Sequence, residues 1–392
     1  MINRKTPLLA VIYREAERIK HNRAYQFLLF IGPLLGILIL YFVFHKGSVR
    51  DLPIAVVNQD NSSLSVKIEN SLDASPDIAV VVHAHDLFQA RHFLENGEVE
   101  AIVFILGNTE KSVFKGLEAP IPVYVNGTNV LKASLIQRSV LSVVRTISGG
   151  VQLKKLMAGG LTEKEAMTRV LPIQIEKHVL FNPCTNYNYF LGAALIHVML
   201  YLFVFLSAVY TLGNELKRGT GQDLLATSNN SVRLAVFGKL FPYTVIFTGF
   251  AMLIDLLLYK IDGMPLNGNY LLLFIGQFIT IITYQLMGLI FMGATSNLRL
   301  ALSLASAYSM MSVTFSGLTF PLEAMPKVAQ GFATIFPFTW WEKLVVSQSF
   351  RGAPLAEALP YVCYLLVFQL LALLFIRTYK RHLSNPSCWG KG

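Results

Sequence analysis

Six long apolar stretches constrain the fold of this chain more than any other feature of its sequence. A helix of about 20 apolar residues is long enough to cross the hydrocarbon core of a bilayer. Only 14% of the 392 residues are charged, against roughly 25% in soluble domains. We therefore predict a membrane protein whose transmembrane domain is an all-α bundle of six helices. The predicted helices cover residues 25–44, 189–212, 240–259, 271–293, 300–320 and 359–376.

Lysine and arginine residues beside these helices predict how the chain is oriented. Such cations are enriched at the cytoplasmic ends of membrane helices. Here they cluster before the first helix, in the loop 213–239 after the second, and in the tail 377–392. Six helices place all three regions on one side, so we expect both termini in the cytoplasm. The net charge of +10 then belongs to the membrane surface, and we expect no nucleic acid partner.

Residues 1–24 are predicted to form a cytoplasmic amphipathic helix that lies in the membrane interface. The apolar side of such a helix inserts below the headgroups, while its cations bind anionic lipids. A solvated basic N-terminus is the alternative. The apolar side carries Leu8, Ile12 and Ile19, and the cationic side carries Arg14, Arg18 and Lys20.

Residues 45–188, between the first two membrane helices, are predicted to form an inserted extracytoplasmic α/β domain. Short β-branched runs alternate there with helical stretches, an order typical of α/β domains. The expected strands are residues 54–57, 78–82, 101–106 and 121–125. One expected helix begins near Ser62, and three more cover residues 86–95, 129–155 and 162–170.

Motifs for catalysis or nucleotide binding are missing from the sequence. In a P-loop, Ser or Thr follows Gly-Lys, and another glycine stands five positions before the glycine of that pair. Gly238 and Lys239 are instead followed by Leu240, and residue 233 is an arginine. His83 and His85 share one face of a strand, but no Cys or carboxylate stands at a suitable spacing for a metal site. We expect no enzyme active site, metal or cofactor in this chain.

The loop 213–239 is longer and more charged than a simple connection between two membrane helices requires. Its central part, E-L-K-R-G-T-G-Q-D-L-L-A-T over residues 215–227, predicts a turn followed by a short helix. A folded polar segment at this place indicates a docking surface, and an ordinary cation-rich loop is the alternative. The candidate residues of this segment are Glu215, Lys217, Arg218, Gly219, Thr220, Leu224 and Leu225.

Polar residues elsewhere in residues 189–376 are candidates for a substrate pathway or gate. Asp255 lies in the third membrane helix, where a carboxylate usually faces a partner or a wet cavity. A structural role near the outer end of that helix is the alternative. Gln277 and Gln285 are expected to bind a neighbouring helix. Residues 321–351 are interrupted by prolines and predict an outer re-entrant segment. The further candidates for a pathway or gate are Ser316, Gly317, Pro321 and Glu323.

Four segments of the sequence, taken in their order along the chain, resemble motifs of the ABC-2 family of transporter permeases. The resemblance covers essentially the whole chain and points to six-span exporter subunits with a large outer domain after the first span. The motifs are P-I-A-V-V-N-Q-D-N-S-S over 53–63, I-P-V-Y-V-N-G-T over 121–128, the coupling segment 215–227 with Gly238-Lys239, and S-G-L-T-F-P-L-E-A-M-P over 316–326.

The resemblance implies the permease subunit of an ABC exporter in a bacterial inner membrane. A drug or lipid-like substrate suits an apolar route with few charges, and so does a peptide, so the sequence leaves the substrate open. ATP and Mg²⁺ would bind to separate ABC ATP-binding subunits. Glu215 and Arg218 would be the charged contacts or a helix-fixing pair, and Gly219 with Thr220 the turn before the coupling helix. Further implied partners are a second permease copy or paralogue, membrane lipids and an envelope adaptor protein at the outer domain. The alternative function is an envelope scaffold or receptor whose outer domain binds a partner, with the spans as an anchor.

Overall fold

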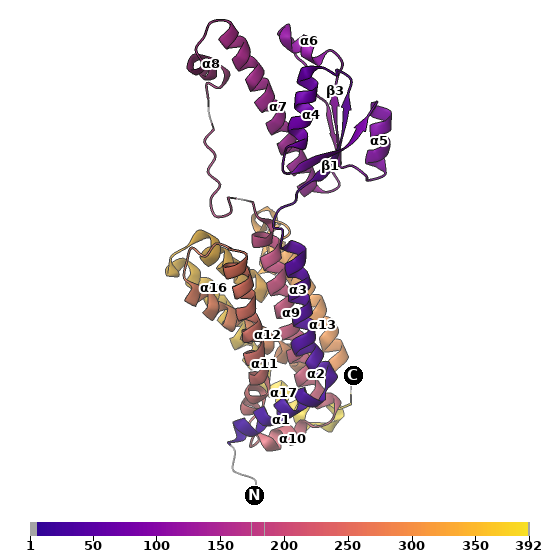
Figure 1. Ribbon diagram of the computed structural model, residues 1–392. Helices are drawn as coiled ribbons and strands as arrows, with labels where there is room; N and C mark the ends of the chain where they lie inside the picture. Colours follow the sequence, from indigo (N-terminus) through magenta and orange to yellow (C-terminus); the bar gives the residue numbers. More distant parts are fainter. Residues whose placement is uncertain (1–5, 174, 184, 391–392) are drawn as a thin grey trace. The chain divides into compact units, whose positions relative to one another are not determined.

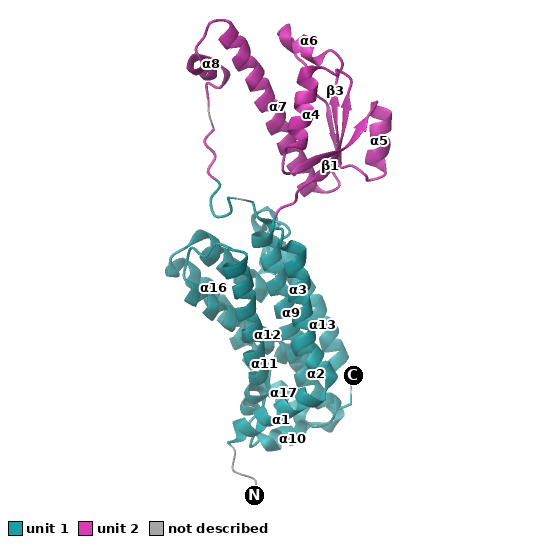
Figure 2. Ribbon diagram, in the orientation of Figure 1, with its two compact units in different colours: residues 1–47, 179–392 teal, residues 48–178 magenta. Residues whose placement is uncertain are grey.

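The computed structural model describes residues 6–173, 175–183 and 185–390. The chain divides into two compact units, which are coloured separately in Figure 2. The helical unit comprises Met1–Gly47 and Val179–Gly392, and the inserted unit comprises Ser48–His178. The inserted unit therefore falls within the predicted range 45–188, after the first long apolar helix.

Within the described residues, six helices are long and apolar enough to cross a membrane, so the predicted number is confirmed. The third helix begins well before its apolar stretch because a helix cap lies further out along the chain. Ser231 accepts a hydrogen bond from the backbone N–H of Leu234, so the third helix begins at Val232 rather than at residue 240. The six are Arg23–Phe44, Asn188–Lys217, Val232–Ile261, Tyr270–Thr295, Leu298–Phe315 and Leu355–Ser384.

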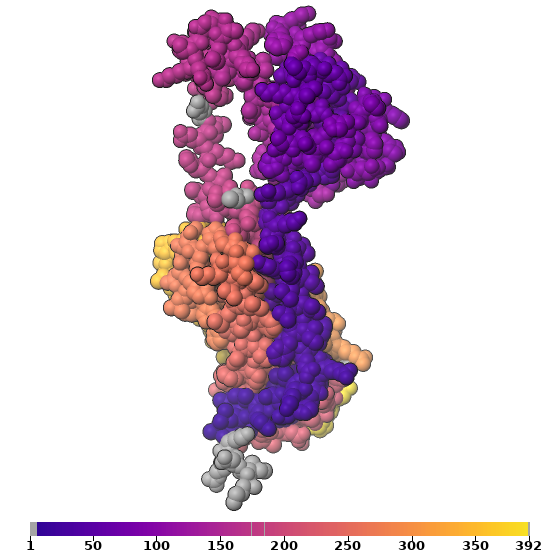
Figure 3. Space-filling model, in the orientation of Figure 1, coloured from indigo at the N-terminus to yellow at the C-terminus, as the bar shows by residue number. Residues whose placement is uncertain are grey.

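The first part of the helical unit contains an N-terminal helix and the first apolar helix. Figure 3 shows these segments as one indigo strip along the side of the helical unit. α1 packs on α11, and α3 packs on α9. The elements are α1 (Pro7–His21), α2 (Arg23–Gln26), the π-helical turn η1 (Phe27–Ile31) and α3 (Gly32–Phe44).

α9 lies at the centre of the helical unit and packs against α3, α11, α12 and α13. Together with the preceding turn η2 it forms a helical segment of 30 residues, Asn188–Lys217. Such a segment is about 45 Å long, whereas the hydrocarbon core is about 30 Å thick, so it extends beyond the core. The elements of this part are η2 (Asn188–Gly192), α9 (Ala193–Lys217), α10 (Gly221–Thr227), α11 (Val232–Asp255), η3 (Leu256–Ile261), α12 (Tyr270–Thr295) and α13 (Leu298–Phe315).

α13 ends at Phe315, five residues before the predicted end, because Gly317 adopts a positive φ of 94° that a helix cannot continue through. Short helices follow and return the chain to the sixth apolar helix, and α15 packs on α12 and α16. These elements are η4 (Leu322–Ala324), α14 (Lys327–Ala333), α15 (Pro337–Val345), η5 (Val346–Arg351), α16 (Leu355–Leu374), α17 (Ile376–Ser384) and η6 (Pro386–Cys388).

The inserted unit is built on a four-stranded sheet in the order β2-β1-β3-β4. β1 pairs in parallel with β2 and β3, and β3 pairs antiparallel with β4. The strands fall where the sequence predicts them, except that β4 starts later because Pro122 has no N–H to donate to the sheet. The strands are β1 (Leu52–Asn58), β2 (Ile78–Ala84), β3 (Ala101–Ile105) and β4 (Val123–Val125).

Helices cover both faces of this sheet. Alternate residues of β1 point to opposite faces, so this strand contributes to two cores. Ile54 and Val56 join a core with α4 and α7, whereas Ala55 and Val57 join a smaller core with α5. Among the described residues, the short helix α6 is not predicted from the sequence, and the other helices match the predicted order. The helices of this unit are α4 (Ser63–Asp73), α5 (Leu87–Glu95), α6 (Thr109–Phe114), α7 (Val130–Ala158) and α8 (Glu163–Val170).

Candidate functional site

α1, α10 and α17 lie at one end of the helical unit, which we call the α10 end (Figure 1). Charged side chains converge there. Glu215, in the last turn of α9, is fully buried at the centre of this cluster. Both guanidinium NH2 groups of Arg14 donate to its two carboxylate oxygens at 3.0 Å. Arg18 bonds the same carboxylate, and the Nζ of Lys239 lies 2.8 Å from it. Glu215 is thereby joined to α1 and to α11.

A second carboxylate, that of Glu15 in α1, completes the cluster and is 1% exposed. The hydroxyls of Thr211 and Tyr243 each donate to it at 2.6 Å. Lys239 donates to both carboxylates and so lies between them. We call Arg14, Glu15, Arg18, Glu215 and Lys239 the charge network.

The charge network fixes three helices against one another because none of its buried charges is left alone. Removing one partner from a buried ion pair typically costs about 3–5 kcal/mol, since it leaves an uncompensated charge in the interior. Burial alone lowers the pKa of Arg18, but the carboxylates of Glu215 and Glu15 raise it by more, so its pKa lies above its ordinary value. The guanidinium therefore stays charged at physiological pH.

The turn after α9 belongs to the same network. Gly219 has a φ of 67°, and the backbone N–H of Thr220 donates to the carbonyl of Glu215 at 2.9 Å, which ends α9. The hydroxyl of Thr220 donates to the Glu215 carboxylate and accepts from Arg18 at 3.1 Å. The position of α10 therefore depends on the charges that surround Glu215.

α10 lies across this end with one face buried and one exposed. Leu224 and Leu225 join the core of the helical unit. Gly221 lies against α17 so closely that a Cβ atom there would be 2.5 Å from the carbonyl oxygen of Leu383. The exposed residues form what we call the α10 surface, which comprises Lys217, Arg218, Gln222, Asp223 and Ala226.

Two interpretations from the sequence differ from this geometry. Arg218 does not pair with Glu215, because the chain turns outward there and leaves Arg218 exposed, while α1 supplies the guanidinium groups. Arg14 and Arg18 bind this carboxylate rather than pointing towards lipid headgroups, whereas Lys20 is exposed.

Sequence reasoning missed Glu15 and Lys239, although each left a signal. Glu15 lies four residues from Val11 and from Ile19, so it shares the buried stripe of α1. Lys239 stands inside an apolar run. An acid and a base that both interrupt apolar faces are candidates for a buried pair.

The pathway candidate Asp255 ends α11 and is 6% exposed. Its carboxylate accepts hydrogen bonds from the hydroxyl of Tyr270 at 3.1 Å and from the amide of Gln277 at 3.4 Å. The amide oxygen of Gln285 accepts from Thr244 at 2.8 Å. Gln277 and Gln285 therefore each bond to a neighbouring helix, as the sequence predicts.

The other pathway candidates lie at the turn after α13. The hydroxyl of Ser316 donates to the carbonyl of Val313 at 2.9 Å, which helps to end the helix before Gly317. Pro321 and Glu323 are exposed. Within the described part of the chain, no hydrogen bond or ion pair joins this turn to Asp255, so the structure does not bring the pathway candidates together.

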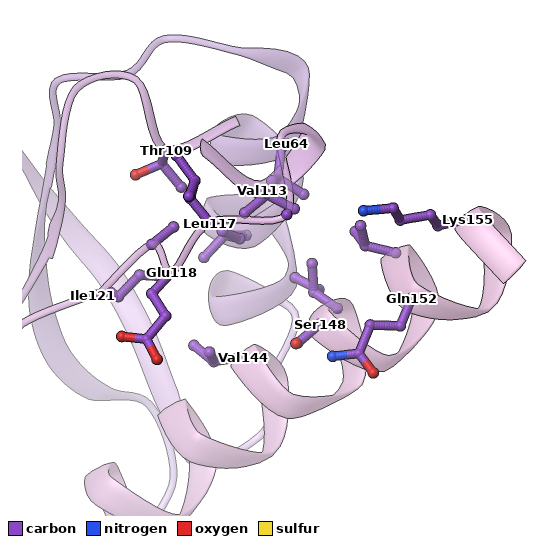
Figure 4. A pocket seen from close by; sticks show the side chains of 15 residues that line it. Leu64, Thr109, Val113, Leu117, Glu118, Ile121, Val144, Ser148, Gln152 and Lys155 are labelled. Carbon is purple, nitrogen blue, oxygen red and sulfur yellow. The ribbon is translucent and has the colours of Figure 1, made fainter. Parts of the chain in front are cut away.

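The inserted unit contains a separate cleft of about 490 Å³ between α4, α6 and α7 (Figure 4). Apolar side chains such as Leu64, Val113 and Val144 line it, together with the polar ends of Gln152 and Lys155. At its edge Leu117, 63% exposed, leaves an apolar surface open to solvent. The cleft is large enough for a small ligand or a protruding side chain of another protein.

Six helices that are long and apolar enough to cross a membrane, together with an inserted α/β unit, define the class of a multi-pass membrane protein. Residues 23–377 match the ABC-2 family transporter protein model, and the chain belongs to this family. It is thus an ABC-2 type transporter permease, and the family implies ATP-binding subunits as partners.

Two relatives from Escherichia coli K12 match along most of the chain. "Probable multidrug ABC transporter permease YbhS" is 22% identical over 350 residues, which is 88% of each protein. "Inner membrane transport permease YhhJ" is 23% identical over 311 residues, which is 78% of this chain and 79% of the relative.

Proposed function

We propose that this chain is the permease subunit of an ATP-driven exporter in a bacterial inner membrane, with both termini in the cytoplasm. ATP-binding subunits, which carry ATP and Mg²⁺, dock on the α10 surface. The charge network is the observation that carries this proposal. It joins the ends of α1, α9 and α11. Thr220, directly before α10, bonds to Arg18 and Glu215 of this network, so a displacement of α10 moves the ends of the three helices together.

The substrate route lies between this permease and a second copy or a paralogue. Closure of the ATP-binding subunits pushes on α10, and the tied helix ends transmit this movement to the bundle. Long apolar helices with few charges suit a drug or a lipid-like substrate. The name of the relative YbhS, a multidrug permease, supports the same substrate class.

Copurification of the full-length permease from its native membrane tests the docking surface. Gln222→Arg and Ala226→Arg place large cations on the exposed face of α10, and we expect the ATP-binding subunit to be lost. The matched control is Val328→Arg, because Val328 is 86% exposed in α14 and far along the chain from α10. Retention of the subunit by both α10 variants would contradict the proposed docking surface.

An envelope scaffold or receptor is the second candidate function, favoured by the cleft and the exposed apolar edge of the inserted unit. In that case the helices act only as an anchor and no ATP-binding subunit copurifies with the wild-type chain. Leu117→Asp would then remove an envelope partner, while Gln222→Arg would change nothing. The two candidate functions therefore predict opposite outcomes for the same pair of variants.

A further inference from the structure

A groove of about 670 Å³ runs along α11 in the helical unit, between this helix, α12 and the junction of α16 with α17. Its volume lies within the range of small-molecule sites, about 300–1,000 Å³. Most of its walls are apolar, and Phe237, Phe241 and Phe278 are more than a third exposed along it. A molecule dissolved in lipid could therefore reach it from the side.

Three uncharged polar side chains, those of Thr244, Thr248 and Gln285, interrupt these apolar walls. Gln285 is 2% exposed, and one end of its amide is used by the hydroxyl of Thr244 at 2.8 Å. In the part of the chain that the structure describes, the Nε2 of Gln285 and the Oγ1 of Thr248 are buried without a hydrogen-bond partner. Thr244 and Thr248 are one turn apart on α11, so these groups form one polar patch in the groove.

The polar patch determines which occupant fits. A buried donor without a partner is unfavourable, and a hydrocarbon chain cannot accept a hydrogen bond from it. An occupant with an acceptor oxygen can. Arg233, exposed in the first turn of α11, lines one end of the groove and disfavours a cation there.

We infer that the groove binds an apolar small molecule that is uncharged or anionic and carries a hydrogen-bond acceptor oxygen, which receives hydrogen bonds from Gln285 and Thr248. The charge network does not contribute to this groove. The inference therefore holds whichever way the permease transports and whichever partner drives it.

A photolabelling experiment with an alkyl benzophenone tests this inference. The probe is apolar, its ketone oxygen is the acceptor, and irradiation couples it to nearby C–H groups. Full-length permease in phospholipid nanodiscs is irradiated with the probe, and labelled peptides are identified by mass spectrometry. We expect labelling to concentrate on α11 and α12 beside Thr248 and Gln285. Diphenylmethane, which lacks the oxygen, should compete only at roughly 25-fold higher concentration, as expected for the loss of both hydrogen bonds, from Gln285 and from Thr248.

Two variants test the space in the groove and the hydrogen bond from Gln285 separately. Gly249 lines the groove, and a Cβ atom there would meet nothing within 4 Å, so Gly249→Phe fills the space without a clash at its first atom. We expect it to abolish labelling of the groove. Gln285→Leu should reduce labelling about five-fold. The control is Ile39→Phe, which adds a ring to an exposed position of α3.

Several outcomes would overturn the inference. One is labelling spread evenly over the lipid-facing helices of the wild type, and another is groove labelling that survives Gly249→Phe. Equal labelling of Gln285→Leu and wild type would mean that the hydrogen bond from Gln285 does not contribute to binding. That is the result expected if ordinary lipid hydrocarbon fills the groove. A disulfide between two copies of Val245→Cys would mean that a second copy covers it, since Val245 is 57% exposed at its edge.

Discussion

Lys239 and Glu215 form a fully buried ion pair, with 2.8 Å between Nζ and Oε1, although they are separated by the whole α10 segment. The pair closes the loop that contains α10, so α10 is held at both of its ends. The same lysine also binds Glu15, which brings the N-terminal helix into the arrangement. A rigid connection of this kind transmits a displacement of α10 to the attached helices, whereas a flexible loop would absorb it.

Lys239→Met should destabilise the helical unit strongly. The substitution leaves Glu15 without its cation in a buried site, and breaking such a pair costs about 3–5 kcal/mol. Thermal unfolding of the purified protein, followed by tryptophan fluorescence, measures the change. Lys20→Met is the control, since Lys20 is exposed and should change stability by less than about 0.5 kcal/mol. Equal stability of the two variants would show that Lys239 is not part of a buried network.

Arg14 and Glu215 should be energetically coupled. Their bidentate contact joins α1 to α9, so each single substitution removes the same interaction. In a double-mutant cycle with Arg14→Ala and Glu215→Gln, we expect a coupling energy of about 1–3 kcal/mol. The measurement is again thermal unfolding of all four proteins. The pair Tyr13 and Glu323, exposed at separate places in the chain, should give additive effects.

Gly221→Ala should loosen the contact between α10 and α17. The added Cβ atom would lie 2.5 Å from a backbone oxygen, and backbone atoms cannot rotate away as a side chain can. We expect a lower unfolding temperature and faster hydrogen exchange in residues 376–384. Gly331→Ala in α14 is the matched control, because its Cβ would meet nothing within 4 Å. If both variants behave like wild type, the close packing of α10 on α17 is wrong.

Asp60→Ala should weaken the inserted unit next to α6. Asn108 precedes α6 without a capping side chain, and Asp60 supplies the cap by accepting from the N–H of Glu110 at 3.1 Å. Loss of a cap typically costs about 1 kcal/mol. Hydrogen exchange of residues 109–114 in the full-length protein should become faster. Asp60→Asn keeps an acceptor oxygen and should restore protection, whereas Glu118→Ala, on an exposed loop nearby, should not affect it.

The N-terminus of α8 should lose stability in acid. The hydroxyl and the backbone N–H of Thr162 donate to the carboxylate of Glu165, which lowers its pKa below the ordinary 4.5. The stabilisation is complete above pH 4.5 and is lost as the pH falls through the lower pKa of the folded state. Carboxyl ¹³C NMR should show Glu165 titrating below pH 4.5. Thr162→Ala removes the hydroxyl donor and should raise the pKa of Glu165 towards 4.5, while the backbone N–H of residue 162 still donates.

Much of the fold could be predicted because its signals are local. The membrane helices follow from apolar stretches, and the helices of the inserted unit follow from caps such as Ser62 and Asp86, each of which accepts a backbone N–H in its own first turn. Span ends were less predictable. Lys217 and Arg233 are charged yet still helical, because the helices continue beyond their apolar parts.

The candidate site was predicted only in part, because its contacts connect distant parts of the chain. The sequence indicated Glu215 as important, but its partners in α1 lie about 200 positions away, with separations of 197 and 201 for Arg18 and Arg14. No local pattern specifies which cation binds a given carboxylate over such a distance. The sequence therefore located the segment, and the structure was needed to identify its partners.

The separation of Glu15 from Lys239 has a consequence for biosynthesis. The lysine is synthesised 224 residues after the glutamate, and at about 5–20 residues per second this takes on the order of ten seconds or more. Until then the carboxylate of Glu15 has no lysine from α11 to pair with. Lys239 can reach it only if the third membrane helix has inserted in the correct direction, because an inverted helix would place the lysine on the opposite side. Closure of the network thus makes stable assembly conditional on the correct topology of the newly made chain.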